Sequence, residues 1–283
     1  MTPTGPYEDS WQLPDFSGPR YSQSLARGLA IMECFKAERP ARGIADIADE
    51  LGMSRSTTHR YLTTLVALGY MEQDKHRKYR LSLRVTDLGM SALNSTGLRE
   101  HSRAVLEELR QGSNFTASLA VLDGSEIVYV DRVVSFQRGQ DKVNIGVGIG
   151  SRLPADRTAM GKVLLAHLPE GEREELLAQV SPLRRPGSSA ITGSEDLRAE
   201  LEEVLREGFA SEDEEFAKGR IAIAAPVRNE TGTTIAAIDL SAHTHMIALE
   251  RLVAGLLPHL LAAADRISAR LGHRREDETA TGV

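Results

Sequence analysis

Cysteine is almost absent from this chain, which has a single one, Cys34, among 283 residues. One cysteine cannot form an intramolecular disulfide, and the eight histidines are scattered, so we find no spacing typical of a metal site. The spacing of Cys34 from Leu25, Leu29 and Ile31 favours a small core residue on a first helix over a redox switch. We therefore expect no metal and no cofactor.

Long apolar runs are missing as well. No stretch approaches the roughly 20 apolar residues that span a bilayer, and residues 1–20 lack the basic and then apolar pattern of a signal peptide. Those residues carry four prolines and no hydrophobic period, which is typical of a disordered tail. We expect a cytoplasmic protein with no membrane partner.

Signatures of catalysis are also absent from the sequence. It has no Gly-Xaa-Ser-Xaa-Gly elbow, no phosphate-binding loop and no dinucleotide fingerprint. The glycine-rich residues 146–150 lead into Ser-Arg-Leu-Pro rather than into a helix, so they match a nucleotide-binding turn poorly. We expect no catalytic residues.

Charge is distributed unevenly along the chain. The formal net charge is -6, which argues against a protein that coats DNA uniformly. Between Arg20 and Met90, however, 12 lysines and arginines accompany 8 acidic residues, and between Met53 and Arg84 the ratio is 7 to 2. A basic module joined to an acidic one is expected when only one part of a protein contacts phosphate.

Residues 44–62 have the pattern of a helix-turn-helix. Apolar residues recur at helical spacing from Ile44 to Leu51, Gly52 can end that helix, and Ser54 can cap a second helix. The second helix should bury Leu62, Leu65, Val66 and Leu68. Polar and cationic side chains at its start are expected to contact double-stranded operator DNA in the major groove: Ser54, Arg55, Ser56, Thr57, Thr58 and Arg60.

Two further elements accompany this pair of helices. A supporting helix is predicted over residues 24–36, with a buried side marked by Leu25, Leu29, Ile31, Met32 and Phe35. Residues 70–83 indicate two short strands around a polar tip, the arrangement of a wing. The charged tip favours contact with the DNA backbone over the alternative of a solvated charge cluster; it consists of Lys75, His76, Arg77 and Lys78.

The rest of the chain predicts a second domain of strands and helices. A linker helix over 85–98, broken near 94–97, leads into it. Strands are expected at 117–122 and 127–133, around the hairpin signal Asp123-Gly124, and at 142–147, 220–227 and 234–240. Helices are expected at 156–166, 170–180, 194–208 and 246–271. We expect the helices on one side of an antiparallel sheet, in the α+β class.

Several of these segments together resemble a known family. Residues 24–29 (Ser-Leu-Ala-Arg-Gly-Leu), 44–62 and 65–70 are similar to the N-terminal signature of the IclR family of bacterial transcriptional regulators. Residues 152–162, 208–215 and 223–227 resemble its second domain. The first signature and the linker residues 84–89 resemble the subgroup that controls aromatic-acid degradation through the β-ketoadipate pathway, including its protocatechuate and catechol branches.

The resemblance implies a domain plan and partners. It places tails at 1–20 and 273–283, a winged helix-turn-helix at 21–84, a linker helix at 85–98 and a GAF-like effector-binding domain at 99–272. It also implies a homodimer or homotetramer on a palindromic operator, controlled by a small organic acid. The effector could be an aromatic acid of the protocatechuate, catechol or 4-hydroxybenzoate type, or alternatively a short keto acid or other small metabolite.

The resemblance further implies an effector site, whose residues are Arg157, Ala159, Met160, Gly161, Glu212, Asp213, Arg220, Ala222, Ile223, Asp239 and Ser241. Ala222, Asp156 and Asp239 depart from the family's usual cysteine, histidine and serine. Asp239 near Glu212 would repel an anionic ligand unless a cation intervenes, and Arg157 or Arg220 could hold its carboxylate. The alternatives are structural ion pairs for both arginines and a solvent-facing edge strand for Asp239.

Three functions remain to be separated. The first hypothesis is a ligand-responsive transcription factor. The second is an enzyme with a DNA-binding appendage, against which the missing catalytic signatures argue. The third is an architectural DNA binder, which would have no use for a second domain of this size.

Overall fold

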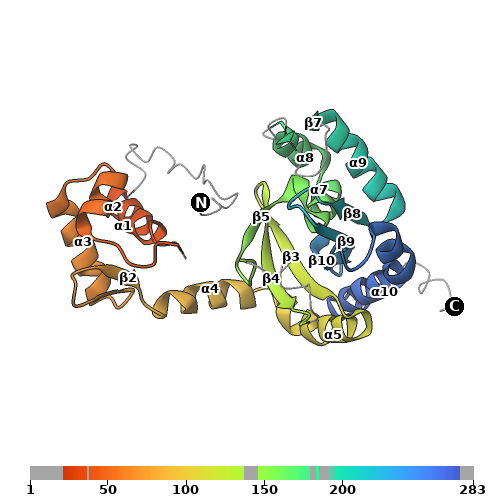
Figure 1. Ribbon diagram of the computed structural model, residues 1–283, viewed down its shortest axis with the longest axis horizontal. Helices are drawn as coiled ribbons and strands as arrows, with labels where there is room; N and C mark the ends of the chain where they lie inside the picture. The colour runs from red at the N-terminus through yellow and green to blue at the C-terminus, as the bar shows by residue number, and fades with distance from the viewer. Residues whose placement is uncertain are drawn as a thin grey trace. The chain divides into compact units, whose positions relative to one another are not determined.

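The structure is a computed structural model that describes residues 22–36, 38–136, 146–178, 183–184, 191–192 and 194–274. The chain forms two compact units, Met1–Ser91 and Ala92–Val283, each of which is considered by itself (Figure 1). The tail predicted at 1–20 lies outside the described residues, as do most of the tail at 273–283 and most of the strand at 142–147.

The first unit contains the predicted helix-turn-helix and a two-stranded wing (Figure 1). Its helices are α1 (Gln23–Glu33), α2 (Ile44–Glu50) and α3 (Arg55–Ala67), and its strands β1 (Met71–Gln73) and β2 (Tyr79–Leu81) pair antiparallel. Between α2 and α3, Gly52 takes a positive φ of 62°, which a side chain would strain. The core of the unit consists of Ile31, Cys34, Ile47, Leu62, Leu65, Met71 and Tyr79.

The apolar face predicted for α1 was partly wrong. Ile31 is buried, but Leu25 and Leu29 are 64% and 51% exposed. At about 100° per residue, Leu29 points almost opposite to Ile31, and this small core covers one narrow side of the helix. On α3, Leu62 and Leu65 are buried as expected, whereas Val66 and Leu68 are exposed.

Helix α4 (Arg84–Asn94) begins the predicted linker, and α5 (Leu98–Ser113) follows it after three residues. The break falls where the sequence indicated it, and Gly97 there has a positive φ of 65°. All eleven residues of α4 are described, and none of them is buried. An amphipathic helix of this length is marginal alone in water, so α4 needs a surface to cover its apolar side.

The second unit is built on a six-stranded antiparallel sheet in the order β5-β4-β3-β10-β9-β8. The hairpin of β3 (Thr116–Asp123) and β4 (Glu126–Val133) turns at Gly124 as predicted, and β9 (Arg220–Arg228) and β10 (Thr234–His243) were also predicted. The sequence pattern missed β5 (Arg152–Pro154) and β8 (Ala210–Asp213), which are too short to show a period. A separate pair joins β6 (Leu183–Arg184) to β7 (Ile191–Thr192).

Helices cover both faces of this sheet, so the expectation of helices on one side was wrong (Figure 1). α5 and α10 (Leu249–Arg270) pack on one face. The other face carries the 3-10 turn η1 (Ala155–Arg157) and α7 (Ala159–Ala166), with α8 (Glu170–Leu177) and α9 (Ser194–Glu207) beyond. Eight successive residues of β9 are buried, which requires cover on both sides. The α+β class is confirmed.

Helix α10 is long and apolar enough to cross a bilayer by length and composition, with a mean hydropathy of 1.3. Its apolar side packs against the sheet and α5, where Leu252, Leu260 and Ile267 are fully buried. In this fold α10 is therefore a core helix of the second unit.

Candidate DNA-binding surface and effector site

The start of α3 is an open, acid-free surface. Ser54 caps the helix by accepting a hydrogen bond from the Thr57 backbone N–H at 3.2 Å, and the first turn carries no acidic residue. Arg55, Ser56 and Arg60 are exposed beside it. Free N–H groups, the positive end of the helix dipole and two arginines together favour an anion such as a DNA phosphate.

Thr58 does not belong to this surface, contrary to the prediction. Its side chain is 0% exposed, and its hydroxyl donates to the Ser54 carbonyl oxygen at 3.1 Å. A residue four positions before Leu62 lies on the same, inward side of α3. Thr58 therefore supports the capped first turn instead of contacting bases.

The wing tip presents the four predicted basic side chains, from Lys75 to Lys78, to solvent. Asp74, which sequence reasoning missed, organises the tip: its Oδ1 accepts the backbone N–H groups of His76 at 2.8 Å and Lys78 at 2.9 Å. The hydrogen bond from Lys78 lowers the pKa of Asp74. An acidic residue followed by a turn is the signal that could have identified this role.

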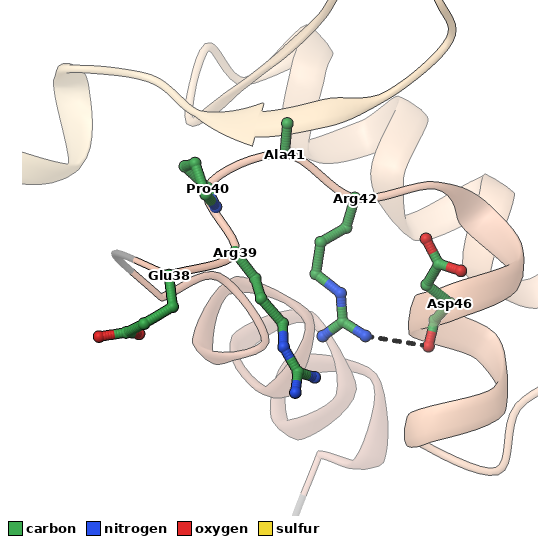
Figure 2. Close-up of a pocket in the computed structure, with 6 residues that line it drawn as sticks. All are labelled: Glu38, Arg39, Pro40, Ala41, Arg42 and Asp46. Carbon is green, nitrogen blue, oxygen red and sulfur yellow. Dashed lines mark hydrogen bonds between the residues drawn. The ribbon is translucent and has the colours of Figure 1, made fainter. Parts of the chain in front are cut away.

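A pocket of about 540 Å³ lies on the connection between α1 and α2, and two arginines, Arg39 and Arg42, line it (Figure 2). Arg42 is buried and donates to the Cys34 carbonyl at 3.0 Å and to the Asp46 carbonyl at 3.2 Å. It also pairs with Glu50 at 2.6 Å. These bonds fasten α2 to the end of α1, and they leave the cation committed to the fold.

In the second unit, the strand register gathers buried polar residues on the face of the sheet that α7 covers. Arg132 on β4 lies opposite Ser118 on β3, which lies opposite Asp239 on β10. In the next row, Ser241 lies opposite Ala222, and Ala222 opposite Glu212 on β8. All the polar residues of these two rows are buried. We call Tyr129, Arg132, Glu212, Arg220, Asp239 and Ser241 the polar cluster.

Arg220 is held by acidic groups at the centre of the polar cluster. It donates to Glu212 and, at 3.3 Å, to Asp239, and its Nη2 lies 3.5 Å from the Tyr129 hydroxyl. Although burial lowers the pKa of Arg220, the two carboxylates outweigh it and raise that pKa above its usual value. For Arg220, the structure therefore shows the structural ion pair that the sequence analysis gave as an alternative.

Asp239 occupies an interior strand, so the alternative of a solvent-facing edge position was wrong. Burial raises its pKa, and Arg220 and Arg132 offset that effect only in part. Its Oδ1 has no hydrogen bond of standard geometry to any described residue, although Ser118 lies beside it. A buried carboxylate oxygen in this condition can accept a hydrogen bond from a ligand hydroxyl.

Of the other residues predicted for the effector site, some lie on the same face of the sheet as the polar cluster and others do not. Ala159, Met160 and Gly161 begin α7 and are buried against the sheet; a side chain at Gly161 would collide with the Ala155 backbone. Ile223 instead points to the opposite face with α5 and α10, because strand residues alternate, and Asp213 is exposed at the end of β8. These two were wrongly assigned.

Arg157 and Arg132 differ in their relation to the polar cluster. Arg157 is half-buried in η1, 3.7 Å from the carboxylate of its neighbour Asp156. Arg132, which the sequence did not single out, lies over the Tyr129 ring at 5.6 Å and donates to the Val147 carbonyl at 2.6 Å. Burial lowers the pKa of Arg132. In the sequence, Arg132 stands in a segment that we interpreted only as a strand, and none of the motifs identified there includes it.

Comparison with known families agrees with both units. Residues 24–75 match the family described as the IclR helix-turn-helix domain, and residues 90–269 match the one described as bacterial transcriptional regulator IclR C-terminal. The chain belongs to the IclR family. It is accordingly a transcriptional regulator with a helix-turn-helix DNA-binding domain.

Relatives of this IclR-family chain cover nearly its whole length. It is 32% identical to the Pca regulon regulatory protein of Pseudomonas putida, over 88% of this chain and 84% of that protein. It is 34% identical to the p-hydroxybenzoate hydroxylase transcriptional activator of Acinetobacter baylyi, over 87% of this chain and 91% of that protein.

Solved structures of this family are also similar. A transcriptional regulator from Rhodococcus sp. RHA1 is 38% identical with a TM-score of 0.77, over 89% of this chain and 98% of that one. An IclR homolog from Microbacterium hydrocarbonoxydans, crystallised with 4-hydroxybenzoate, is 29% identical with a TM-score of 0.75, over 88% of this chain and 98% of that one.

Proposed function

We propose that this regulator responds to a small hydroxylated aromatic acid bound at the polar cluster, and that it controls genes for the breakdown of such an acid. The observation that carries the proposal is the placement of buried Arg132 and buried Asp239 on either side of Ser118 across the sheet. A relative named as the activator of p-hydroxybenzoate hydroxylase and an IclR homolog crystallised with 4-hydroxybenzoate support the same class of ligand.

The polar cluster has complementary groups for both ends of such a molecule. A carboxylate requires a cation when it is buried, and Arg220 is already neutralised by Glu212 and Asp239. Arg132 therefore replaces Arg157 and Arg220 as our candidate for the carboxylate. Asp239 would accept a hydrogen bond from the ring hydroxyl, and Ala222 and Ala224 place only small side chains on the same face of the sheet.

A ligand panel tests this assignment by calorimetry and thermal shift. We expect 4-hydroxybenzoate or protocatechuate to stabilise the protein, by about 2.7 kcal/mol at 100 times the dissociation constant. Benzoate lacks the hydroxyl and 4-hydroxybenzyl alcohol lacks the carboxylate, so each should bind at least tenfold more weakly. Stabilisation by pyruvate alone would identify the keto-acid alternative, and no response to any acid would refute the aromatic-acid proposal.

The role of Arg132 has its own test. Arg132→Gln should weaken 4-hydroxybenzoate binding at least tenfold and leave 4-hydroxybenzyl alcohol binding nearly unchanged, because only the first ligand carries the charge. Arg157→Gln is the matched control and should bind both ligands as the wild type does. If Arg157→Gln loses affinity and Arg132→Gln keeps it, the carboxylate lies at η1.

The same proposal includes a second copy of the chain as partner. Leu88 on α4 is 56% exposed, and Val85 and Ala92, three residues before it and four after it, share its side of the helix. Two recognition helices about 34 Å apart are what a selective reader of a palindromic operator requires. We propose that α4 is the dimer seam and that the dimer acts in the cytoplasm.

A further inference from the structure

We propose that β4 couples the effector site to α5 through Asp131, which exchanges between Arg103 and Arg99 when Arg132 engages a ligand. The proposal rests on the proposed function, because it requires a ligand at Arg132. Asp131 and Arg132 are consecutive, and their side chains lie on opposite faces of the sheet. One strand segment thus contacts the effector site on one side and α5 on the other.

Asp131 is wholly buried and is the point where α5 is fastened to β4. Its Oδ1 accepts a hydrogen bond from Arg103 Nη1 at 2.9 Å and from the Arg132 backbone N–H at 2.8 Å. The same Nη1 of Arg103 lies 3.3 Å from the Arg132 carbonyl. Arg103 therefore holds the Arg132 carbonyl directly and the Arg132 N–H through the Asp131 carboxylate, so a shift of the backbone at Arg132 would change the bonds to α5.

We call Asp131 and the two arginines of α5 beside it, Arg99 and Arg103, the clamp. Arg99 precedes Arg103 by one helical turn, and its Nε forms a long ion pair with Asp131 Oδ1 at 3.8 Å, beyond hydrogen-bond distance. Asp131 Oδ2 is buried with no hydrogen-bond partner in the described part of the chain. A small displacement of β4 against α5 would bring Arg99 onto that carboxylate. Two discrete partners for one buried acid form the kind of bistable contact that converts sub-ångström shifts into a helix movement.

The direction of the coupling follows from the chain itself. α5 begins at Leu98, three residues after α4 ends, and α4 continues into the unit that carries the helix-turn-helix. A change in the position of α5 is therefore passed to the linker by covalent connection. The ligand can alter operator affinity only as far as it prefers one of the two clamp arrangements.

Hydrogen–deuterium exchange with 4-hydroxybenzoate as the probe tests the proposal without a known operator. In the full-length wild type, we expect the ligand to change amide exchange at least threefold in β10 and also in residues 99–106 of α5. In Asp131→Asn, we expect the β10 change to persist and the α5 change to disappear. Arg103→Gln should behave in the same way, and its half-exposed position makes a folding failure less of a concern.

The matched control is Glu108→Gln. Glu108 also fastens α5, but through Arg266 of α10 at 2.7 Å rather than through β4. This variant should keep both exchange changes. An undiminished α5 response in Asp131→Asn and Arg103→Gln, or an equal loss in Glu108→Gln, would overturn the coupling. A wild type with no change even in β10 would instead overturn the proposed function on which it rests.

Discussion

At the scale of single residues, buried charge determines what each side chain of the second unit can do. At most 8% of each side chain is exposed for Arg220, Glu212 and Asp239, and Arg220 forms ion pairs with both acids. Arg220 stabilises both buried carboxylates, so it is part of the fold. If it turned to a ligand, Glu212 and Asp239 would be left to repel each other without a cation between them. For this reason we propose Arg132, and not Arg220, as the contact for the ligand carboxylate.

Arg220→Met should destabilise the protein by about 3 to 5 kcal/mol in urea unfolding, because it leaves two buried carboxylates without their cation. The matched control is Arg152→Met, which removes a half-exposed arginine from Asp123 and Glu126. That change should cost at most about 1 kcal/mol. Equal effects of the two substitutions would show that the polar cluster is not held together by Arg220.

Cys34 should be nearly unreactive in the folded protein. Burial, and then the neighbouring Glu50, raise the pKa of its thiol to about 11, and the thiol donates to the Ala30 carbonyl. Since the thiolate is the reactive form, only about one molecule in a thousand is reactive at pH 8. Labelling with a thiol-specific disulfide reagent should be at least a hundredfold slower than in urea, and comparable rates would contradict the burial of Cys34.

At the scale of elements, we expect α3 and the wing to contact DNA in different ways. Arg55 lies at the start of a recognition helix, where side chains meet base edges, whereas Lys78 lies on a tip suited to phosphates. Arg80, nearby on β2, is paired with Glu72 at 2.7 Å, so part of its charge is compensated within the wing. Within the wing, Lys78 is therefore the candidate for phosphate contact, and Arg80 is a basic residue with which its effect can be compared.

Arg55→Ala should weaken binding to a selected operator by about 1 to 3 kcal/mol if it contacts a guanine edge. Lys78→Ala should weaken binding to all DNA sequences alike and flatten the salt dependence by about one unit. Arg80→Ala is the control for the wing and should have the smaller effect. Titrations by fluorescence anisotropy at several salt concentrations measure all three, and unchanged affinity in the first two would remove this surface from DNA binding.

At the scale of the whole molecule, α4 is a helix with no buried residue. Leu88→Asp should produce monomers, because it places a charge in the proposed seam, and it should lower specific operator affinity by removing one recognition helix. Thr86→Asp, two residues before Leu88 and therefore almost opposite to it on α4, is the control. Multi-angle light scattering measures the molar mass of the assembly directly. A Leu88→Asp variant that remains a dimer would place the seam elsewhere.

The sequence by itself determined the elements whose causes are local. The helix-turn-helix follows from apolar spacing, a glycine that can take positive φ at Gly52 and a capping hydroxyl at Ser54, all within a few residues of one another. The β3–β4 hairpin follows from Asp123-Gly124 for the same reason. The family resemblance reinforced these assignments and supplied most of the residues proposed for the effector site, including the buried Glu212, Arg220 and Asp239.

Only the tertiary structure decided which of those residues work together. Strand register placed Arg132, Ser118 and Asp239 in one row although more than a hundred positions separate the first from the last. The same pairing turned Ile223 away from the site and made Asp239 interior, and helix packing buried Thr58 while it exposed Leu25. Local pattern fixes what an element is, whereas the partners of a side chain depend on which distant segments fold against it, and no periodicity in the chain records that.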